Sequence, residues 1–145
     1  MARLYAQLCA LVFLVVGIGG LAAGSAGPPA ANGGGNIGSL TLHLTWARDV
    51  LDIALLAAFV FVGFVASRHL GRILAGAIGI ALLALAIVGF LVGDDAAASA
   101  GHSYAGLHFT TALNILDLVV GVLGILAALG TVEDPAPAPR SVLRG

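Results

Sequence analysis

Two short stretches of the chain carry the side chains that could do chemistry. The first holds Arg48, Asp49 and Asp52, and the second holds Asn114 and Asp117, each set within apolar sequence. Their spacings of three and four residues place each set on one face of a helix. A charged group in apolar surroundings is costly unless it is paired or neutralised. Side chains of these types can therefore form a hydrogen-bonded network or line a path for protons or ions.

The two stretches are copies of one another. Residues 42–53 and 107–118 are identical at six of their twelve positions, which include a histidine, a threonine and the last aspartate. Polar residues repeated inside apolar surroundings are hard to explain by composition, so we interpret the chain as a duplication. We expect both copies to contribute to one polar network, which consists of Thr45, Arg48, Asp49, Asp52, Thr110, Asn114 and Asp117.

This polar network has more acids than bases. Arg48 and Asp52 can pair at i, i+4 on a helix. The second copy has Leu113 in the position of Arg48, so Asp117 has no cation of its own. We expect Asp117 to be protonated, to use Arg48 of the other copy, or to bond to a neighbouring amide or hydroxyl such as Asn114 or Thr45.

Two functions for the network compete. It can be a structural contact that holds helices together, or a proton or ion path lined by Asp49, Asp52 and Asp117. Residues 54–66 and 118–129 contain no ionisable side chain, so no polar path continues beyond the network. This pattern favours the structural function.

The equivalent residues His43 and His108 raise a third alternative. Two histidines on facing helices can ligate a haem iron or a chlorin magnesium, although an interfacial histidine is more commonly structural. His69 and His102 fall in expected loops. We expect no metal site, and we expect no enzyme, because no nucleophile lies beside a base in the sequence. There is also no nucleic-acid-binding signature.

Composition predicts a membrane protein. The 145 residues are 60% hydrophobic and only 9% charged, with a mean hydropathy of +1.10, whereas soluble domains have roughly 25% charged residues. About 20 apolar residues are enough to cross a bilayer as a helix. Four runs reach that length, namely 4–23, 40–66, 73–92 and 107–129, and we expect the second to begin as a helix at the membrane interface.

Arginine positions predict the orientation. Five of the six arginines lie at the N-terminus, in or beside the short loop 67–71, or in the C-terminal tail. The positive-inside rule then places both termini in the cytoplasm. The absence of lysine, with abundant alanine and glycine, is typical of a GC-rich bacterial genome. We therefore expect a multi-pass protein of the bacterial inner membrane, with the lipid bilayer as its first partner.

The duplication extends to the other two helices. It predicts repeats at 3–67 and 72–130, followed by a disordered tail at 131–145. A unit with two crossings re-enters the membrane on its starting side, so the repeats are expected to be parallel. Glycines four apart near the ends of helices 1 and 3 predict close helix packing. These glycines are Gly20, Gly24, Gly89 and Gly93.

The chain resembles a mainly actinobacterial family of small four-helix membrane proteins of unknown function. The resemblance is carried by the start Arg3-Leu4-Tyr5-Ala6, by the glycine-rich end of helix 1, and by the repeated motifs that begin helices 2 and 4. Asp52 and Asp117 stand where that family usually has histidine. The resemblance implies the fold and topology, but no metal or cofactor role of those histidines can be transferred.

Together these patterns predict an all-α protein with four transmembrane helices, in which two parallel two-helix repeats form a compact bundle. The expected role is structural or accessory, with docking on a second copy or on a larger membrane complex. The alternatives are proton or ion conduction and a haem- or pigment-binding bundle.

Overall fold

The computed structural model describes residues 1–23, 35–37, 40–92, 103–104 and 107–131. Most of these residues are helical. The helices are α1 (Ala2–Ala23), α2 (Trp46–Val60), a five-residue π-helix η1 (Phe61–Val65), α3 (Arg68–Val92) and α4 (Thr111–Leu129). Gly24, Gly93, His102 and the tail from residue 132 onward lie outside the described residues, so the predictions made for them are not addressed.

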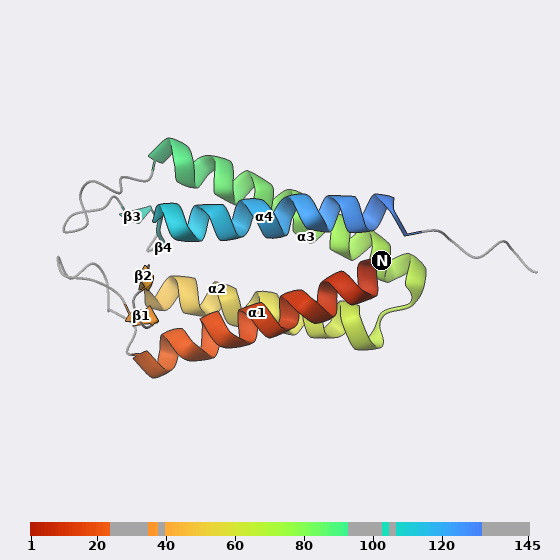
Figure 1. Cartoon of the computed structure of the whole chain (residues 1–145), viewed down its shortest axis with the longest axis horizontal. Helices are drawn as coiled ribbons and strands as arrows, with labels where there is room; N and C mark the ends of the chain where they lie inside the picture. The colour runs from red at the N-terminus through yellow and green to blue at the C-terminus, as the bar shows by residue number, and fades with distance from the viewer. Residues whose placement is uncertain (24–34, 38–39, 93–102, 105–106, 132–145) are drawn as a thin grey trace, which may run out of the picture.

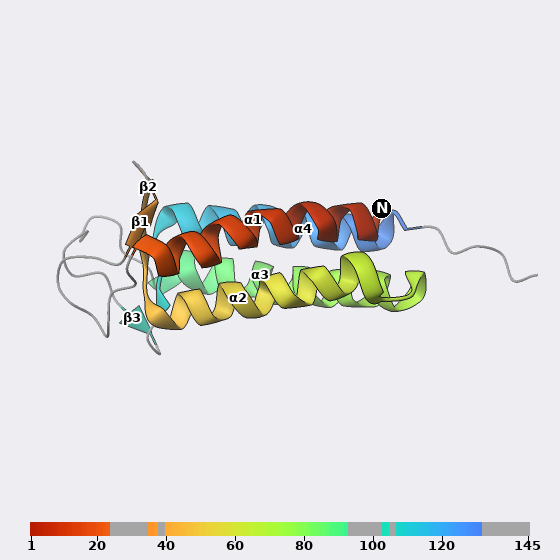
Figure 2. The same ribbon diagram turned by 90° about the horizontal axis from the view of Figure 1, so that it is seen from below.

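The long helices lie side by side in an elongated bundle (Figures 1 and 2). Most contacts lie within two pairs, α1 with α2 and α3 with α4, and fewer lie between the pairs. Among the described residues, α1, α3 and α4 are each long and apolar enough to cross a membrane. The helix α2 has 15 residues and continues directly into η1.

Large apolar side chains cover the outside of these helices. Leu8 and Leu11 on α1, Ile80 on α3, and Leu126 on α4 are each more than half exposed. A soluble protein rarely presents so much contiguous apolar surface to water. This surface is consistent with a membrane protein whose outer face contacts lipid.

The starts of the second and fourth helices differ from the sequence prediction. Residues Leu40–Leu44 form strand β2, which pairs antiparallel with β1 (Gly35–Ile37), and Leu107–His108 form β4, which pairs with β3 (Ser103–Tyr104). The expectation that the helices begin at about residues 40 and 107 was therefore wrong, although the fold as a whole is mostly helical. The helices begin only after Thr45 and Thr110.

These two threonines explain the delayed starts. Thr45 (φ −94°, ψ 161°) and Thr110 (φ −100°, ψ 154°) are extended, and the side-chain oxygen of each accepts a hydrogen bond of 3.3 Å from the backbone N–H three residues later. Threonine is a favoured N-cap because its hydroxyl satisfies an N–H that has no partner within the helix. The residues before each cap therefore belong to the hairpins, and each cap sets the register of the polar residues that follow.

Replacing either cap with alanine is expected to destabilise the protein by about 1 kcal/mol, because the first helical turn loses its hydrogen bond. The free energy of unfolding of Thr45→Ala and Thr110→Ala can be measured by SDS titration in mixed micelles. Thr45→Ser retains the hydroxyl and serves as the control. Equal stability of Thr45→Ala and Thr45→Ser would contradict a capping role.

The connection between α2 and α3 is shorter than predicted. The sequence indicated a loop over residues 67–71, but α3 begins at Arg68, so His69 lies on an exposed helical turn instead of in a loop. The end of α2 widens into η1, where Gly63 O accepts a hydrogen bond of 3.2 Å from Gln7 Nε2. Arg3 donates to Ala66 O at 2.8 Å. Polar side chains of α1 thus bind carbonyl groups at the end of its partner helix.

The pair α3 and α4 packs backbone against backbone. A Cβ added at Gly121 would lie 2.7 Å from Leu83 N and 2.8 Å from Gly79 O, and one at Gly79 would lie 2.9 Å from Ile125 N. No side chain other than hydrogen fits between helices at such a separation. Glycine at these positions is therefore required by the packing of this pair.

Candidate functional site

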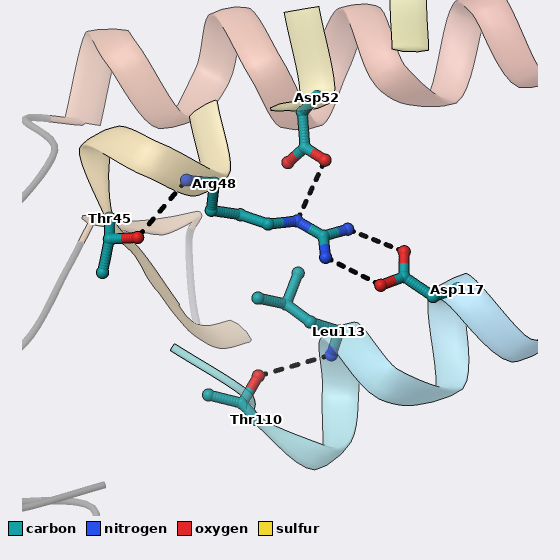
Figure 3. Close-up of polar contacts among 6 residues, drawn as sticks. All are labelled: Thr45, Arg48, Asp52, Thr110, Leu113 and Asp117. Carbon is teal, nitrogen blue, oxygen red and sulfur yellow. Dashed lines mark hydrogen bonds and ion pairs between the residues drawn. The ribbon is translucent and has the colours of Figure 1, made fainter. Parts of the chain in front are cut away.

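The centre of the polar network is Arg48, whose guanidinium group extends from α2 to α4. Its NH1 donates to Asp117 Oδ2 and its NH2 donates to Asp117 Oδ1, both at 2.7 Å (Figure 3). This bidentate geometry is the strongest that a guanidinium and a carboxylate can adopt. Arg48 is 2% exposed, so the ion pair is shielded from solvent. It links the two helix pairs across the bundle.

Arg48 also contacts the aspartate one turn along its own helix. Its Nε lies 2.9 Å from Asp52 Oδ1, which is the i, i+4 pairing that the sequence predicted. The two atoms lie within ion-pair distance but outside hydrogen-bond geometry, because Nε and both Asp52 oxygens make no hydrogen bond with the residues that the structure describes. The guanidinium group of Arg48 therefore lies between Asp52 and Asp117, which occupy equivalent positions in the two copies. Its hydrogen bonds go to Asp117, on the other helix pair (Figure 3).

This geometry decides among the alternatives for Asp117. Asp117 pairs with Arg48 of the other copy. This was the second of the three alternatives, and no separate cation is needed. The position equivalent to Arg48 is occupied by Leu113, which is 1% exposed and packs with Leu44 in a small apolar cluster. The second copy thus contributes an aliphatic side chain where the first contributes a cation.

All seven residues of the predicted polar network are buried, each with 8% or less of its surface exposed. They are Thr45, Arg48, Asp49, Asp52, Thr110, Asn114 and Asp117. The structure brings Arg48, Asp52 and Asp117 into direct contact, whereas the threonines act on their own helix starts. Two further members, Asp49 and Asn114, lie against glycines of the neighbouring helices.

Gly20 and Gly89 make room for these two polar side chains. A Cβ at Gly20 would overlap Asp49 Oδ1, and one at Gly89 would overlap Asn114 Oδ1. The sequence predicted that these glycines permit close approach of helices. The structure shows that what they admit is a polar side chain of the partner helix rather than its backbone.

The apolar neighbours of the two glycines also correspond. A Cβ at Gly20 would lie 2.8 Å from Leu44 Cδ1, and one at Gly89 would lie 2.9 Å from Phe109 Cδ1. Leu44 and Phe109 occupy equivalent positions in the repeated motif. Each helix pair therefore has the same local arrangement of a glycine, a buried polar side chain and an apolar side chain.

A second polar contact joins the helix pairs, and the sequence analysis missed it. The Tyr5 hydroxyl on α1 donates to Val120 O on α4 at 2.9 Å. The signal was a phenol within an apolar run, which needs a hydrogen-bond acceptor once it is buried. Gly124 leaves the space, because a Cβ there would lie 2.7 Å from the Tyr5 hydroxyl oxygen.

The packing beside this contact is aromatic and apolar. Tyr5 meets Phe59 edge to face with ring centroids 5.7 Å apart, and Phe13 stacks on Phe59 at 5.4 Å. These rings belong to an apolar core that also contains Val62 and Val120. The core follows the polar network along the bundle, so the network is bounded on this side by apolar side chains.

The predicted histidine pair is not on facing helices. His43 lies on strand β2 and His108 on strand β4, and their side chains lie outside the described residues. The premise of two helical ligands was therefore wrong. Within the described residues, no group of three histidine, cysteine or acidic side chains is arranged to hold a metal ion.

The fold and the site together define the class of this protein. It is mostly helical, has apolar helices long enough to cross a membrane, and contains a buried polar network with ion-pair contacts between them. The chain matches no protein-family profile, no curated protein and no solved structure. The resemblance to the actinobacterial family consequently remains a prediction.

Proposed function

We propose that the chain is a multi-pass protein of the bacterial inner membrane with a structural or accessory role. In this proposal four helical segments cross the bilayer, both termini face the cytoplasm, and two parallel two-helix repeats are joined by the polar network. The observation that carries the proposal is the buried bidentate ion pair between Arg48 and Asp117, because it links the helix pairs directly.

The fourth crossing is assigned to α2 with η1. The two follow one another without a break from Trp46 to Val65, and about 20 helical residues are enough to cross the hydrocarbon core. The buried charges of α2 face the bundle interior, which is where ionisable side chains are tolerated in membranes.

The parallel repeat is supported by corresponding contacts. Gly20 with Asp49 in one pair matches Gly89 with Asn114 in the other. The N-cap threonines Thr45 and Thr110 begin equivalent helices. Two units that preserve the same contacts are expected if both derive from one duplicated hairpin.

A structural role agrees with the surroundings of the network. Phe13, Phe59 and Val120 are buried beside it, and each is 5% exposed or less. Polar contacts between membrane helices contribute about 0.6 kcal/mol each on average, so their main effect is on which helices become neighbours. A conducting path would instead need polar groups that continue across the bundle.

Liposomes containing the purified protein are expected to show no proton flux above that of protein-free liposomes, because apolar packing bounds the network. The purified protein is also expected to lack visible absorption. Flux that Asp52→Asn abolishes would contradict the structural role and favour conduction. A Soret band lost in His43→Ala or His108→Ala would instead favour a haem- or pigment-binding function.

A further inference from the structure

One carboxyl group of the polar network has surroundings that suit a neutral acid. Asp52 is fully buried, and neither of its oxygens accepts a hydrogen bond from the described residues. A buried carboxylate normally accepts several hydrogen bonds, since it has lone pairs on two oxygens. Figure 3 shows one Asp52 oxygen, Oδ1, beside the Arg48 guanidinium, while Oδ2 has no donor among the residues that the structure describes.

Asp117 is the contrasting case. Both of its oxygens accept hydrogen bonds of 2.7 Å from the terminal nitrogens of Arg48. The same guanidinium group offers Asp52 only its Nε, at 2.9 Å and outside hydrogen-bond geometry. The positive charge of Arg48 is therefore engaged mainly by Asp117.

The described groups around Asp52 do not supply a second cation. Within the described residues, α2 contributes Arg48 and Asp49, and α4 contributes Asp117. From α1 the neighbour is Gly17, where a Cβ would lie 3.5 Å from Asp52 Cβ. If all three acids were ionised beside one guanidinium, the network would hold excess negative charge in apolar surroundings, which is costly.

We propose that Asp52 is a proton-binding site, which takes its proton from water and remains neutral while Asp117 stays the ionised partner of Arg48. The proposal rests on the membrane placement given above. A neutral Asp52 no longer competes with Asp117 for Arg48, and its hydroxyl becomes a donor. Release of the proton would leave two carboxylates sharing one guanidinium group and would weaken the contact between the helix pairs.

Infrared spectroscopy of the full-length protein in lipid bilayers at neutral pH tests the proposal. A protonated carboxyl group has a C=O stretching band that an ionised one lacks, and the band shifts in D2O. We expect this band in the wild-type protein and its loss or decrease in Asp52→Asn. A wild-type spectrum without the band, or an undiminished band in Asp52→Asn, would overturn the proposal.

Stability provides a second readout, since asparagine resembles a neutral aspartic acid. Asp52→Asn is expected to unfold at the same SDS fraction as the wild type, whereas Asp117→Asn, which loses an ionised partner of Arg48, is expected to unfold at a lower one. Equal destabilisation by both substitutions would identify Asp52 as an ionised partner and overturn the proposal. In that case a folded protein without proton flux would still support the proposed structural role.

Discussion

Arg48→Leu is expected to destabilise the protein by about 3–5 kcal/mol, because removal of one partner leaves the other charge buried without compensation. The substitution leaves the Asp117 carboxylate buried without a partner, because both of its oxygens lose their hydrogen bonds of 2.7 Å. Leu113, the equivalent residue of the second copy, is buried, so leucine suits a buried helical position of this kind, and the loss is expected to come from the unpaired carboxylate. SDS titration of the purified variant measures the loss.

Two controls separate the loss of the ion pair from other effects. Arg68→Leu removes the same side chain from an exposed position, where solvent screens its polar interactions, and it is expected to cost less than about 1 kcal/mol. The double variant Arg48→Leu with Asp117→Leu replaces the pair with apolar groups and is expected to recover much of the stability. If Arg48→Leu alone unfolds at the wild-type SDS fraction, the ion pair does not hold the helix pairs together.

Gly121→Ala is expected to have the second large effect, a destabilisation of about 1–3 kcal/mol from overpacking. The added methyl group would meet backbone atoms, with Leu83 N at 2.7 Å and Gly79 O at 2.8 Å. Backbone atoms cannot rotate away as a side chain can, so α3 and α4 must separate along their length. The free energy of unfolding from SDS titration is again the measurement.

Gly71→Ala is the matched control for this substitution. A Cβ at Gly71 would have Val62 O as its nearest neighbour at 3.6 Å, which is an ordinary contact. Because alanine favours a helix over glycine by up to about 1 kcal/mol, Gly71→Ala is expected to be neutral or stabilising. Equal stabilities of Gly121→Ala and Gly71→Ala would show that α3 and α4 are not in close backbone contact.

Much of the site could be predicted because a polar residue within an apolar membrane segment is stable only where it faces other polar groups inside the bundle. Their helical spacing and the cost of exposing charge to lipid required the polar faces of α2 and α4 to turn inward, and the spacing of Arg48 and Asp52 defined their pairing. The choice of Asp117 as the main partner of Arg48 could not be derived. It depends on the distance between helices that are far apart in sequence.

The helix starts show a second limit. Leu40–Leu44 reads Leu-Thr-Leu-His-Leu, and this strict alternation of apolar and polar residues is a strand signal that the length of the apolar run concealed. The deciding feature was the capping threonine in each copy, which indicates a helix start. The Tyr5 contact was also not predicted. Its acceptor is the backbone carbonyl of Val120, and because every residue has such a carbonyl, the sequence does not indicate which one is used.

In the hydrogen bonds between the helix pairs, the donors lie on the first pair and the acceptors on the second. Among the described residues, Arg48, Tyr5 and the Ala2 N–H donate from the first pair, and Asp117, Val120 and Thr131 accept on the second. Two second halves facing one another would have no cation at this position, because Leu113 stands in the place of Arg48. If the halves arose by the proposed duplication, loss of the cation left the second half dependent on Arg48 of the first for the partner of its buried carboxylate.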